Sequence, residues 1–382
     1  MEFKLNDELK NITPFIVMEM LEKAKAMEQK GEHIIHFEVG EPDFDIPKVV
    51  QQAMAKALQD GQTHYTHSLG LIELREEIAQ FYKTEYDVTI SPNQVMITSG
   101  TSASVLLIIK TLCNSGDEVI ISDPGYACYA NFLRASQVKP IFINVFAENN
   151  FQFNIDEVKS KITPKTKAIF LNSPMNPTGV LVSDDVFTEL SKLNIPIISD
   201  EIYHGLHHGE QLKSLLNFNP NGIVVNGFSK RWAMTGLRLG WIITPEPLIR
   251  PLQILQQNLF ICAPTLSQYG GISALKESMP EVESMRITYA QRGSYMRQRL
   301  EEMGLKIAGD PKGAFYLFCD VRDLTNNSYQ FCLDALTNAN IAITPGIDFG
   351  NNGEGFIRFS YATSIENIKE GMDRLERYLR RK

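Results

Sequence analysis

Lys230 is the residue of this chain whose surroundings most favour covalent chemistry. It follows the apolar run 222–228 after a single serine, and it precedes Arg238 by eight positions. An amine in such a place is partly withdrawn from water, so its pKa falls and its neutral form can attack a carbonyl to make a Schiff base. Lys230 is therefore predicted to be a nucleophile rather than a solvated surface lysine.

A second candidate group lies where the apolar run 95–98 passes into a helix through Ser99, Gly100, Thr101 and Ser102. Backbone N–H groups at a helix start, with hydroxyls beside them, bind phosphate. An ordinary Ser/Thr N-cap also accounts for this segment when it is taken alone. The segment matches neither the P-loop nor the Gly-x-Gly-x-x-Gly pattern, which disfavours a nicotinamide oxidoreductase.

Two further polar groups follow apolar runs. Asp200 ends the run 197–200, with Tyr203 three residues later, and ligands of open α/β sheets gather at the carboxyl ends of strands. Asn176 lies in a loop with two prolines and a glycine, which holds its amide in one orientation. A helix cap at Asp200 and a plain turn around Asn176 are the structural alternatives.

The scaffold for these groups is predicted from seven apolar runs, each bounded by turn residues. They cover residues 94–98, 118–122, 139–145, 168–171, 195–199, 223–226 and 240–244. Helical stretches such as 104–113 and 184–193 lie between several of them, which favours a mostly parallel seven-stranded sheet covered by helices. The sequence thus predicts an α/β fold with a large domain over residues 46–282.

The two ends of the chain are predicted to form a smaller domain. Helical spacing occurs over 14–31 and 365–381, and the chain is mainly helical from Pro251 to about Met303. Strand-like runs at 314–319 and 356–361 follow. Residues 1–45 and 283–382 are therefore assigned to a small α+β domain.

Composition excludes several classes of function. The net charge of -8, without a dense basic block, disfavours nucleic-acid binding. The absence of an apolar run of eighteen residues and of a signal-peptide pattern disfavours membrane insertion and secretion. Five scattered cysteines indicate reduced thiols, and hence a cytoplasmic protein. No metal site is predicted, because nothing completes a ligand set around His204, His207 and His208, which are expected at a loop surface.

The motifs occur in an order that chance does not explain: Ser-Gly-Thr-Ser, Pro-Gly-Tyr, Asn-Pro-Thr-Gly, Asp-x-x-Tyr, Ser-Lys and Gly-x-Arg-x-Gly. In this the chain resembles the class I/II aminotransferases, fold-type I enzymes that depend on pyridoxal 5'-phosphate. The resemblance runs from about Ile12, through Gly-Glu-Pro-Asp-Phe at 40–44, to Ala362. It implies the fold predicted above and an enzyme that moves an amino group.

The resemblance also implies roles for the residues around the cofactor ring. Lys230 would form the Schiff base with the cofactor and then move the substrate proton. Asp200 would pair with the protonated pyridine nitrogen, which keeps the ring an electron sink. Asn176 and Tyr203 would hydrogen-bond the phenolic oxygen, and Tyr126 would stack on the ring face.

Phosphate and carboxylate contacts follow from the same resemblance. The phosphate group would be held by Gly100, Thr101, Ser102 and Arg238, with Tyr65 reaching it from the neighbouring subunit of a homodimer. The substrate α-carboxylate would bind Arg358, assisted by the backbone at Gly40 and by Asn176. An arginine among apolar neighbours on a strand needs a partner anion, which fits this role.

Two positions depart from the family pattern. The family often has a serine three residues before the lysine, where this chain has Gly227, so Ser229 is the candidate substitute. Some family members that prefer dicarboxylates have a lysine after the position of Thr101, where this chain has Ser102. A preference for aspartate is therefore not supported by this position, and a distal arginine from elsewhere in the protein is the alternative source of such a preference.

The resulting hypothesis is an aminotransferase that works on amino acids and 2-oxo acids in two half-reactions, with ping-pong kinetics. A carbon–sulfur β-lyase on the same scaffold is the alternative, since both reactions pass through the same Cα carbanion. A transcriptional regulator with an aminotransferase-like domain is disfavoured because the resemblance begins so early in the chain. Selectivity for the side chain is expected to depend on segments near Phe15, Ile16 and Thr265.

Overall fold

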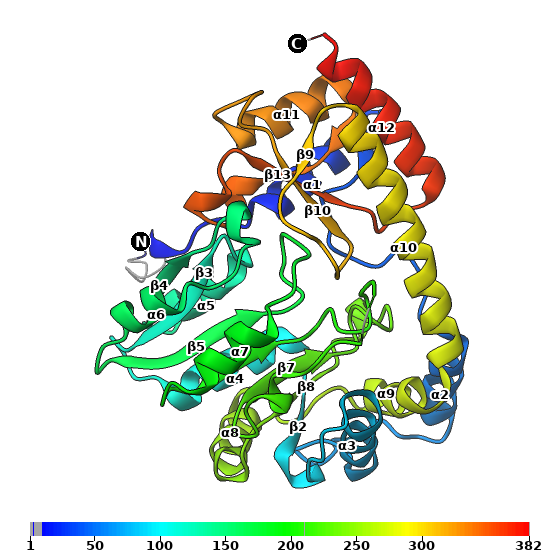
Figure 1. Ribbon diagram of the computed structural model, residues 1–382. Helices are drawn as coiled ribbons and strands as arrows, with labels where there is room; N and C mark the ends of the chain where they lie inside the picture. Colours follow the sequence, from blue (N-terminus) through cyan, green and yellow to red (C-terminus); the bar gives the residue numbers. More distant parts are fainter. Residues whose placement is uncertain (1–2, 4–9, 210, 382) are drawn as a thin grey trace.

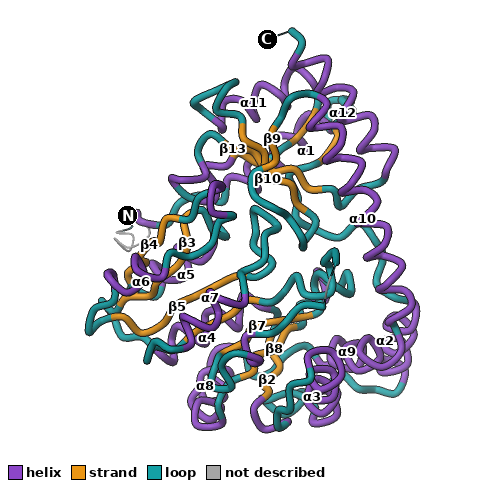
Figure 2. Tube along the Cα trace, viewed as in Figure 1, coloured by secondary structure: helices purple, strands orange, loops and turns teal. Residues whose placement is uncertain are grey.

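The computed structural model describes residues 3, 10–209 and 211–381 of the 382-residue chain. It has two parts, a lower part built on a large sheet and an upper part built from the two ends of the chain (Figure 1). Figure 2 shows the strands of both parts at the centre, with helices on the outside. Among the described residues, no helix has the length and apolar character needed to cross a membrane.

The large sheet contains all seven predicted strands, with ends within two residues of the predicted ones. Its order is β2-β8-β7-β6-β5-β3-β4. The strands are β2 (Val95–Thr98), β3 (Glu118–Asp123), β4 (Lys139–Asn144), β5 (Thr166–Asn172), β6 (Ile197–Asp200), β7 (Ile223–Gly227) and β8 (Gly240–Ile243). Only β8 runs antiparallel to its neighbours, so the prediction of a mostly parallel sheet is confirmed.

Helices cover both faces of this sheet, because alternate side chains of each strand point to opposite faces. One face packs on α4 (Thr101–Leu112), α5 (Ala127–Ala135) and α8 (Glu246–Leu259). The other face packs on α2 (Lys48–Gln59), α3 (Ile72–Tyr86), α6 (Ile155–Lys161), α7 (Asp184–Ser191) and α9 (Thr265–Glu277). Neighbouring residues of β5 illustrate the alternation, since Ile169 belongs to the second core and Phe170 to the first.

The small domain is built around an antiparallel sheet with the order β12-β13-β10-β9. Its strands are β9 (Lys306–Ile307), β10 (Tyr316–Asp320), β12 (Thr344–Pro345) and β13 (Phe356–Ser360), and β1 (Ile35–His36) pairs with β11 (Ile341–Ala342). Its helices are α1 (Ile16–Glu28), α10 (Met279–Glu302), α11 (Ser328–Ala339) and α12 (Ile365–Leu379). The N-terminal helix α1 contributes Met20 and Ala24 to this core, which joins the two ends of the chain.

The helix α10 runs along one side of the molecule from α2 and α9 up to α12 (Figure 1). Its N-terminal Val282 packs in a core of the large domain, and its Met296 packs in the core of the small domain. The boundary expected between residues 282 and 283 therefore falls inside a continuous helix. The division into 46–282 and the two ends stays a prediction.

Candidate active site

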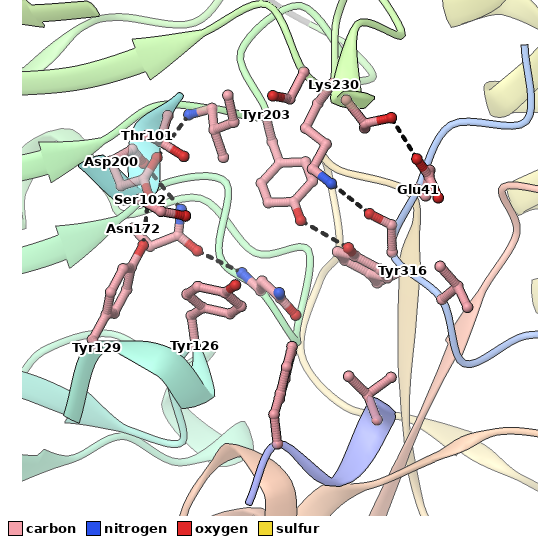
Figure 3. A pocket seen from close by; sticks show the side chains of 18 of the residues that line it. Glu41, Thr101, Ser102, Tyr126, Tyr129, Asn172, Asp200, Tyr203, Lys230 and Tyr316 are labelled. Atoms are coloured by element: carbon pink, nitrogen blue, oxygen red, sulfur yellow. Dashed lines mark hydrogen bonds between the residues drawn. The ribbon is translucent and has the colours of Figure 1, made fainter. Parts of the chain in front are cut away.

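A cavity of about 310 Å³ lies where the two domains meet, beside the carboxyl ends of β5 and β6. Its walls come from both domains and from the segment before α1. Most of the residues singled out in the sequence line it: Gly40, Thr101, Ser102, Tyr126, Asn176, Asp200, Tyr203, Ser229, Lys230, Arg238 and Arg358. Several of these side chains converge in Figure 3.

The amine of Lys230 points into this cavity, just after β7, and donates a hydrogen bond to the carbonyl oxygen of Gly40. Burial lowers the pKa of Lys230 to about 8, helped by the positive charges of Arg358 and Arg238, although Glu41 opposes the shift. The direction is the one expected from its sequence neighbours. About a tenth of the amine is thus neutral, and nucleophilic, at pH 7, far more than for a lysine with the ordinary pKa.

The carboxylate of Asp200 lies at the end of β6, where it is buried and lines the cavity. Burial raises its pKa to about 6, although two hydrogen bonds that it accepts act in the opposite direction. These come from the hydroxyl of Tyr129, over 2.8 Å, and from the backbone N–H of Ile202, over 3.0 Å. Asp200 is therefore an anchored acid that is largely ionised at pH 7.

A cradle for an anion forms where β2 passes into α4. Gly100 has a φ of 84°, and a Cβ atom there would lie 2.5 Å from Nη2 of Arg238. The arginine is held from the other side, because its Nη1 donates to the carbonyl oxygen of Thr235 over 2.8 Å. The N-terminal turn of α4, with Thr101 and Ser102, thus shares one wall of the cavity with a guanidinium group, which suits a phosphate dianion.

The departure at Gly227 has a steric explanation. A Cβ atom at this position would lie 2.9 Å from the carbonyl oxygen of Leu239 and 3.0 Å from Cα of Gly240. A serine would therefore force β7 and the chain after Arg238 apart. Ser229 lines the cavity, whereas Gly227 does not, so the hydroxyl of Ser229 is available to the site.

The guanidinium of Arg358, on β13, is only 3% exposed. It donates to Oδ1 of Asn176 over 2.8 Å, to the carbonyl oxygen of Glu38 and to Oγ1 of Thr344. Within the described part of the chain it forms no salt bridge, and its Nε has no partner. A buried cation without a protein carboxylate is costly, and an anion entering the cavity would compensate it.

Aromatic side chains complete the cavity walls. Tyr126 meets Phe15 edge-on, with ring centroids 6.2 Å apart, and meets Tyr129 edge-on at 5.1 Å. The hydroxyls of Tyr203 and Tyr316 lie 2.7 Å apart (Figure 3). Of the segments expected to control selectivity, the one around Phe15 and Ile16 lines the cavity through Phe15, Val17 and Met18, and the one at Thr265 does not.

Besides Gly100, which directly precedes α4, Tyr65 is the predicted site residue that does not line the cavity. Its side chain is 78% exposed, and it is not among the cavity-lining residues. Tyr65 is therefore open to solvent and takes no part in the cavity of its own chain.

Sequence reasoning missed two tyrosines that the structure places in or beside the site, Tyr129 and Tyr316. Tyr129 follows Tyr126 by three residues, which is the spacing of neighbours on one face of a helix. Tyr316 precedes Phe318, the partner of Arg358 in the β10–β13 pairing, so strand alternation puts both on one face. These spacings point to the site only when the position of the helix and the pairing of the strands are known.

The expectation that His204 lies at a loop surface is wrong. His204 is 4% exposed, and its Nδ1 is 3.0 Å from the hydroxyl of Tyr86. The loop after β6 folds inward over the sheet, and burial lowers the pKa of His204 to about 3. His207 and His208 are half-buried, so they lie closer to the expected surface position than His204 does. Among the described residues no group of side chains could hold a metal ion.

Comparison with known proteins agrees with this geometry. Residues 32–375 match the family model for aminotransferase class I and II. The chain is 40% identical to a (5-formylfuran-3-yl)methyl phosphate transaminase of Methanocaldococcus jannaschii, with 98% of this chain and 99% of that protein covered. It is 36% identical to an aspartate aminotransferase of Pyrococcus abyssi, with 99% of each covered.

The fold matches solved structures equally well. An aminotransferase from Mycobacterium tuberculosis superposes with a TM-score of 0.96 at 32% identity, over 100% of both chains. None of these names supports the alternative of a carbon–sulfur β-lyase. Enzymes of this family generally depend on pyridoxal phosphate. With its lysine, its acid and its arginines gathered in one interdomain cavity, the chain belongs to the class I and II aminotransferases and is an aminotransferase.

Proposed function

We propose that this aminotransferase binds pyridoxal 5'-phosphate in the interdomain cavity, covalently through Lys230. The supporting observation is that a neutralisable amine, a buried acid and an anion cradle line the same space. When bound, this cofactor supplies an electron sink for the negative charge left on Cα. The amine of Lys230, the acid of Asp200 and the anion cradle suit the aldehyde, the pyridine nitrogen and the phosphate group of this cofactor, respectively.

The ring contacts are assigned as follows. Asp200 holds the proton of the pyridine nitrogen, because its buried carboxylate is already fixed by two hydrogen bonds. Tyr126 covers one face of the ring. Asn176 and Tyr203 donate to the phenolic oxygen.

The phosphate contacts are assigned to the cradle at the start of α4. Gly100, Thr101 and Ser102 present their backbone and hydroxyl groups, and Arg238 supplies the positive charge. Ser229 takes the place of the serine that the steric limits at position 227 exclude.

Arg358 holds the α-carboxylate of the substrate, together with the backbone at Gly40 and the amide of Asn176. Amino acids and 2-oxo acids both carry this group, so one arginine serves both half-reactions. Once the amino group of the substrate has displaced it, the free amine of Lys230 would take the proton from Cα and then deliver it to the carbon that receives the amino group. Its position beside Gly40, within reach of the groups around Arg358, supports this assignment.

We further propose that the side chain of the preferred substrate carries no negative charge. The cations that line the cavity, within the described residues, are Lys230, Arg238 and Arg358, and each already has a role. Glu41 adds a negative charge to the wall. The names of the relatives, an aspartate aminotransferase and a transaminase of a phosphate ester, therefore do not identify the substrate of this chain. Measuring the activity with aspartate, alanine and phenylalanine as amino donors tests the proposal. Aspartate as the best donor would contradict it.

The active unit is proposed to be a homodimer in which Tyr65 reaches the phosphate group of the neighbouring subunit. Its 78% exposure supports this, since the side chain is accessible to a neighbouring subunit. Tyr65→Phe should weaken cofactor binding without changing the mass found by light scattering. A monomeric wild-type protein with full activity would refute the dimer.

A cytoplasmic location is proposed from the cysteines. All five are free, and two of them, Cys319 and Cys332, are buried. Free thiols persist in a reducing compartment.

Reductive trapping tests the central assignment. Treatment of the cofactor-loaded protein with sodium borohydride should attach the pyridoxyl group to Lys230, as found by mass spectrometry of the peptides. Lys230→Ala should lose both the label and turnover while remaining folded. Lys192→Ala, at an exposed lysine directly after α7, is the matched control and should retain both. A label on another lysine would refute the assignment.

A further inference from the structure

Tyr316 contacts groups from three separate parts of the chain. It lies at the start of β10, its side chain is 1% exposed, and it lines the cavity. Its hydroxyl is 2.7 Å from that of Tyr203 in the large domain. Its ring carries the guanidinium carbon of Arg358 on its face, 4.3 Å from the centroid. A Cβ atom on Gly40 would collide with the same hydroxyl at 2.0 Å, so it also rests against the backbone that receives Lys230.

The contact with Arg358 follows from the strand pairing. In the β10–β13 pair, Phe318 is opposite Arg358 and Tyr316 is opposite Ser360, so Tyr316 and Arg358 are diagonal neighbours on one face. A cation over an aromatic face gains most where water is excluded, as it is here. The ring of Tyr316 is therefore a support for the arginine that is proposed to hold the substrate carboxylate.

The direction of the hydrogen bond between Tyr316 and Tyr203 follows from the number of protons that each hydroxyl can donate. A tyrosine hydroxyl can donate one hydrogen bond, and it can accept others. If Tyr203 donates to the phenolic oxygen of the cofactor, its own oxygen is left to accept from Tyr316. Tyr316 is the one side chain within the described residues that hydrogen-bonds the Tyr203 hydroxyl. The donor at Tyr316 thus directs the Tyr203 proton into the cavity.

We propose that Tyr316 is a positioning residue with two separable actions: its hydroxyl orients Tyr203, and its ring seats Arg358. Through Tyr316 the substrate carboxylate site in the small domain is in contact with the cofactor site in the large domain. The inference rests on the proposed function, because it assumes that Tyr203 meets the cofactor and Arg358 meets the substrate.

Two substitutions separate the actions. Tyr316→Phe keeps the ring and removes the hydroxyl, whereas Tyr316→Leu removes both. For Tyr316→Phe we expect kcat to fall by about tenfold with KM changed less than about twofold. For Tyr316→Leu we expect, in addition, a rise in KM of about tenfold for every amino acid donor alike, since Arg358 loses its support.

A spectroscopic readout distinguishes positioning from a general structural effect. A well-aimed Tyr203 hydroxyl stabilises negative charge on the phenolic oxygen, so its loss should move the midpoint of the absorbance–pH titration of the loaded enzyme to higher pH. This shift is expected in Tyr316→Phe. It should be absent in Tyr361→Phe, a matched small-domain control whose hydroxyl donates to the carbonyl oxygen of Ala314 and does not line the cavity.

Combining Tyr316→Phe with Tyr203→Phe gives a second test, which compares the titration midpoints of the single and double variants. If Tyr316 acts through Tyr203, adding Tyr316→Phe to Tyr203→Phe should cause no further shift of the midpoint. Additive shifts, or a wild-type midpoint in Tyr316→Phe, would overturn the inference. Borohydride labelling of Lys230 should remain complete in Tyr316→Phe, and its failure in the wild-type protein would instead overturn the proposed function.

Discussion

The hydroxyl of Tyr129 donates a hydrogen bond to Oδ2 of Asp200 over 2.8 Å, which ties α5 to the end of β6. The two residues are 71 positions apart in the chain, and both are buried. The ring of Tyr129 also packs on Phe170, with centroids 4.3 Å apart, and meets Tyr126 edge-on. Tyr129 therefore contacts both the acid proposed to hold the pyridine nitrogen and the ring proposed to stack on the cofactor.

Removing this hydroxyl should shift the pH dependence of the reaction. The bond stabilises the ionised form of Asp200, so in Tyr129→Phe the pKa of Asp200 rises above its value of about 6. Because the reaction needs the carboxylate, the acid limb of the kcat profile should move to higher pH, with kcat at pH 7 reduced by about twofold for a rise of about one pKa unit. An unchanged acid limb would contradict the assigned role of Asp200.

The buried acid should also cost stability in the cofactor-free protein. The folded pKa of Asp200, about 6, is above its usual 3.8, so the folded state binds the proton more tightly and the free energy of unfolding falls as pH rises from about 4 to about 6. Asp200→Asn should therefore be more stable than the wild type at pH 7, by about 1–2 kcal/mol, although it is inactive. Urea unfolding at pH 7 and pH 4 measures this, and an equal gain at both would contradict the cause.

The lowered pKa of Lys230 should appear in the rate of cofactor capture. Only the neutral amine reacts, so the rate at which cofactor-free protein takes up pyridoxal 5'-phosphate should rise with pH and level off above about 8. Glu41 raises this pKa, and Glu41→Gln should therefore move the plateau to lower pH. Stopped-flow absorbance gives the profile. A rate that still climbs at pH 10 would show an ordinary lysine.

Arg358 should act on all substrates alike. Arg358→Lys cannot reproduce the bonds to Asn176, Thr344 and the Glu38 carbonyl, so we expect KM to rise by about a hundredfold for every amino acid and 2-oxo acid. Arg322→Ala, at an exposed arginine of the same domain, is the control and should leave KM unchanged. A loss restricted to one class of side chain would indicate that Arg358 does not bind the common carboxylate.

The phosphate cradle can be tested with two glycines of similar backbone. Gly100 and Gly116 have φ values of 84° and 82°, but a Cβ atom meets Arg238 only at Gly100 and meets nothing within 4 Å at Gly116. Both alanine variants should lose about 1 kcal/mol of stability from the unfavourable φ. Only Gly100→Ala should weaken cofactor binding, by about tenfold or more, as measured by fluorescence titration. Equal cofactor affinities of the two variants would show that the close approach of Gly100 to Arg238 does not contribute to phosphate binding.

Much of the fold was predictable because its pattern is local. The apolar runs that form β2 to β8 are bounded by turn residues, and their ends agree with the structure. The order of these strands was not predictable, since it depends on which runs pair. The helix α3 was also missed, although Leu74, Ile78 and Tyr82 face the core at helical spacing.

The candidate site likewise contains residues that could be predicted from local sequence and residues that could not. Lys230, Asp200, Asn176 and Arg238 could be singled out because each follows a strand or a motif with its own chemical pattern. His204 was wrongly placed, since nothing in its neighbours shows that its loop turns inward.

The sequence by itself determined the family, and it singled out Lys230 and Asp200 as the candidate nucleophile and acid, because these inferences depend on residue types at fixed short spacings. Only the tertiary structure decided that Tyr129 supports Asp200, that Tyr316 lies between Tyr203 and Arg358, and that Gly227 has no room for a side chain. The physical reason is that these contacts join segments distant in the chain, and such contacts are set by packing between elements and leave no pattern in the sequence around any one of them.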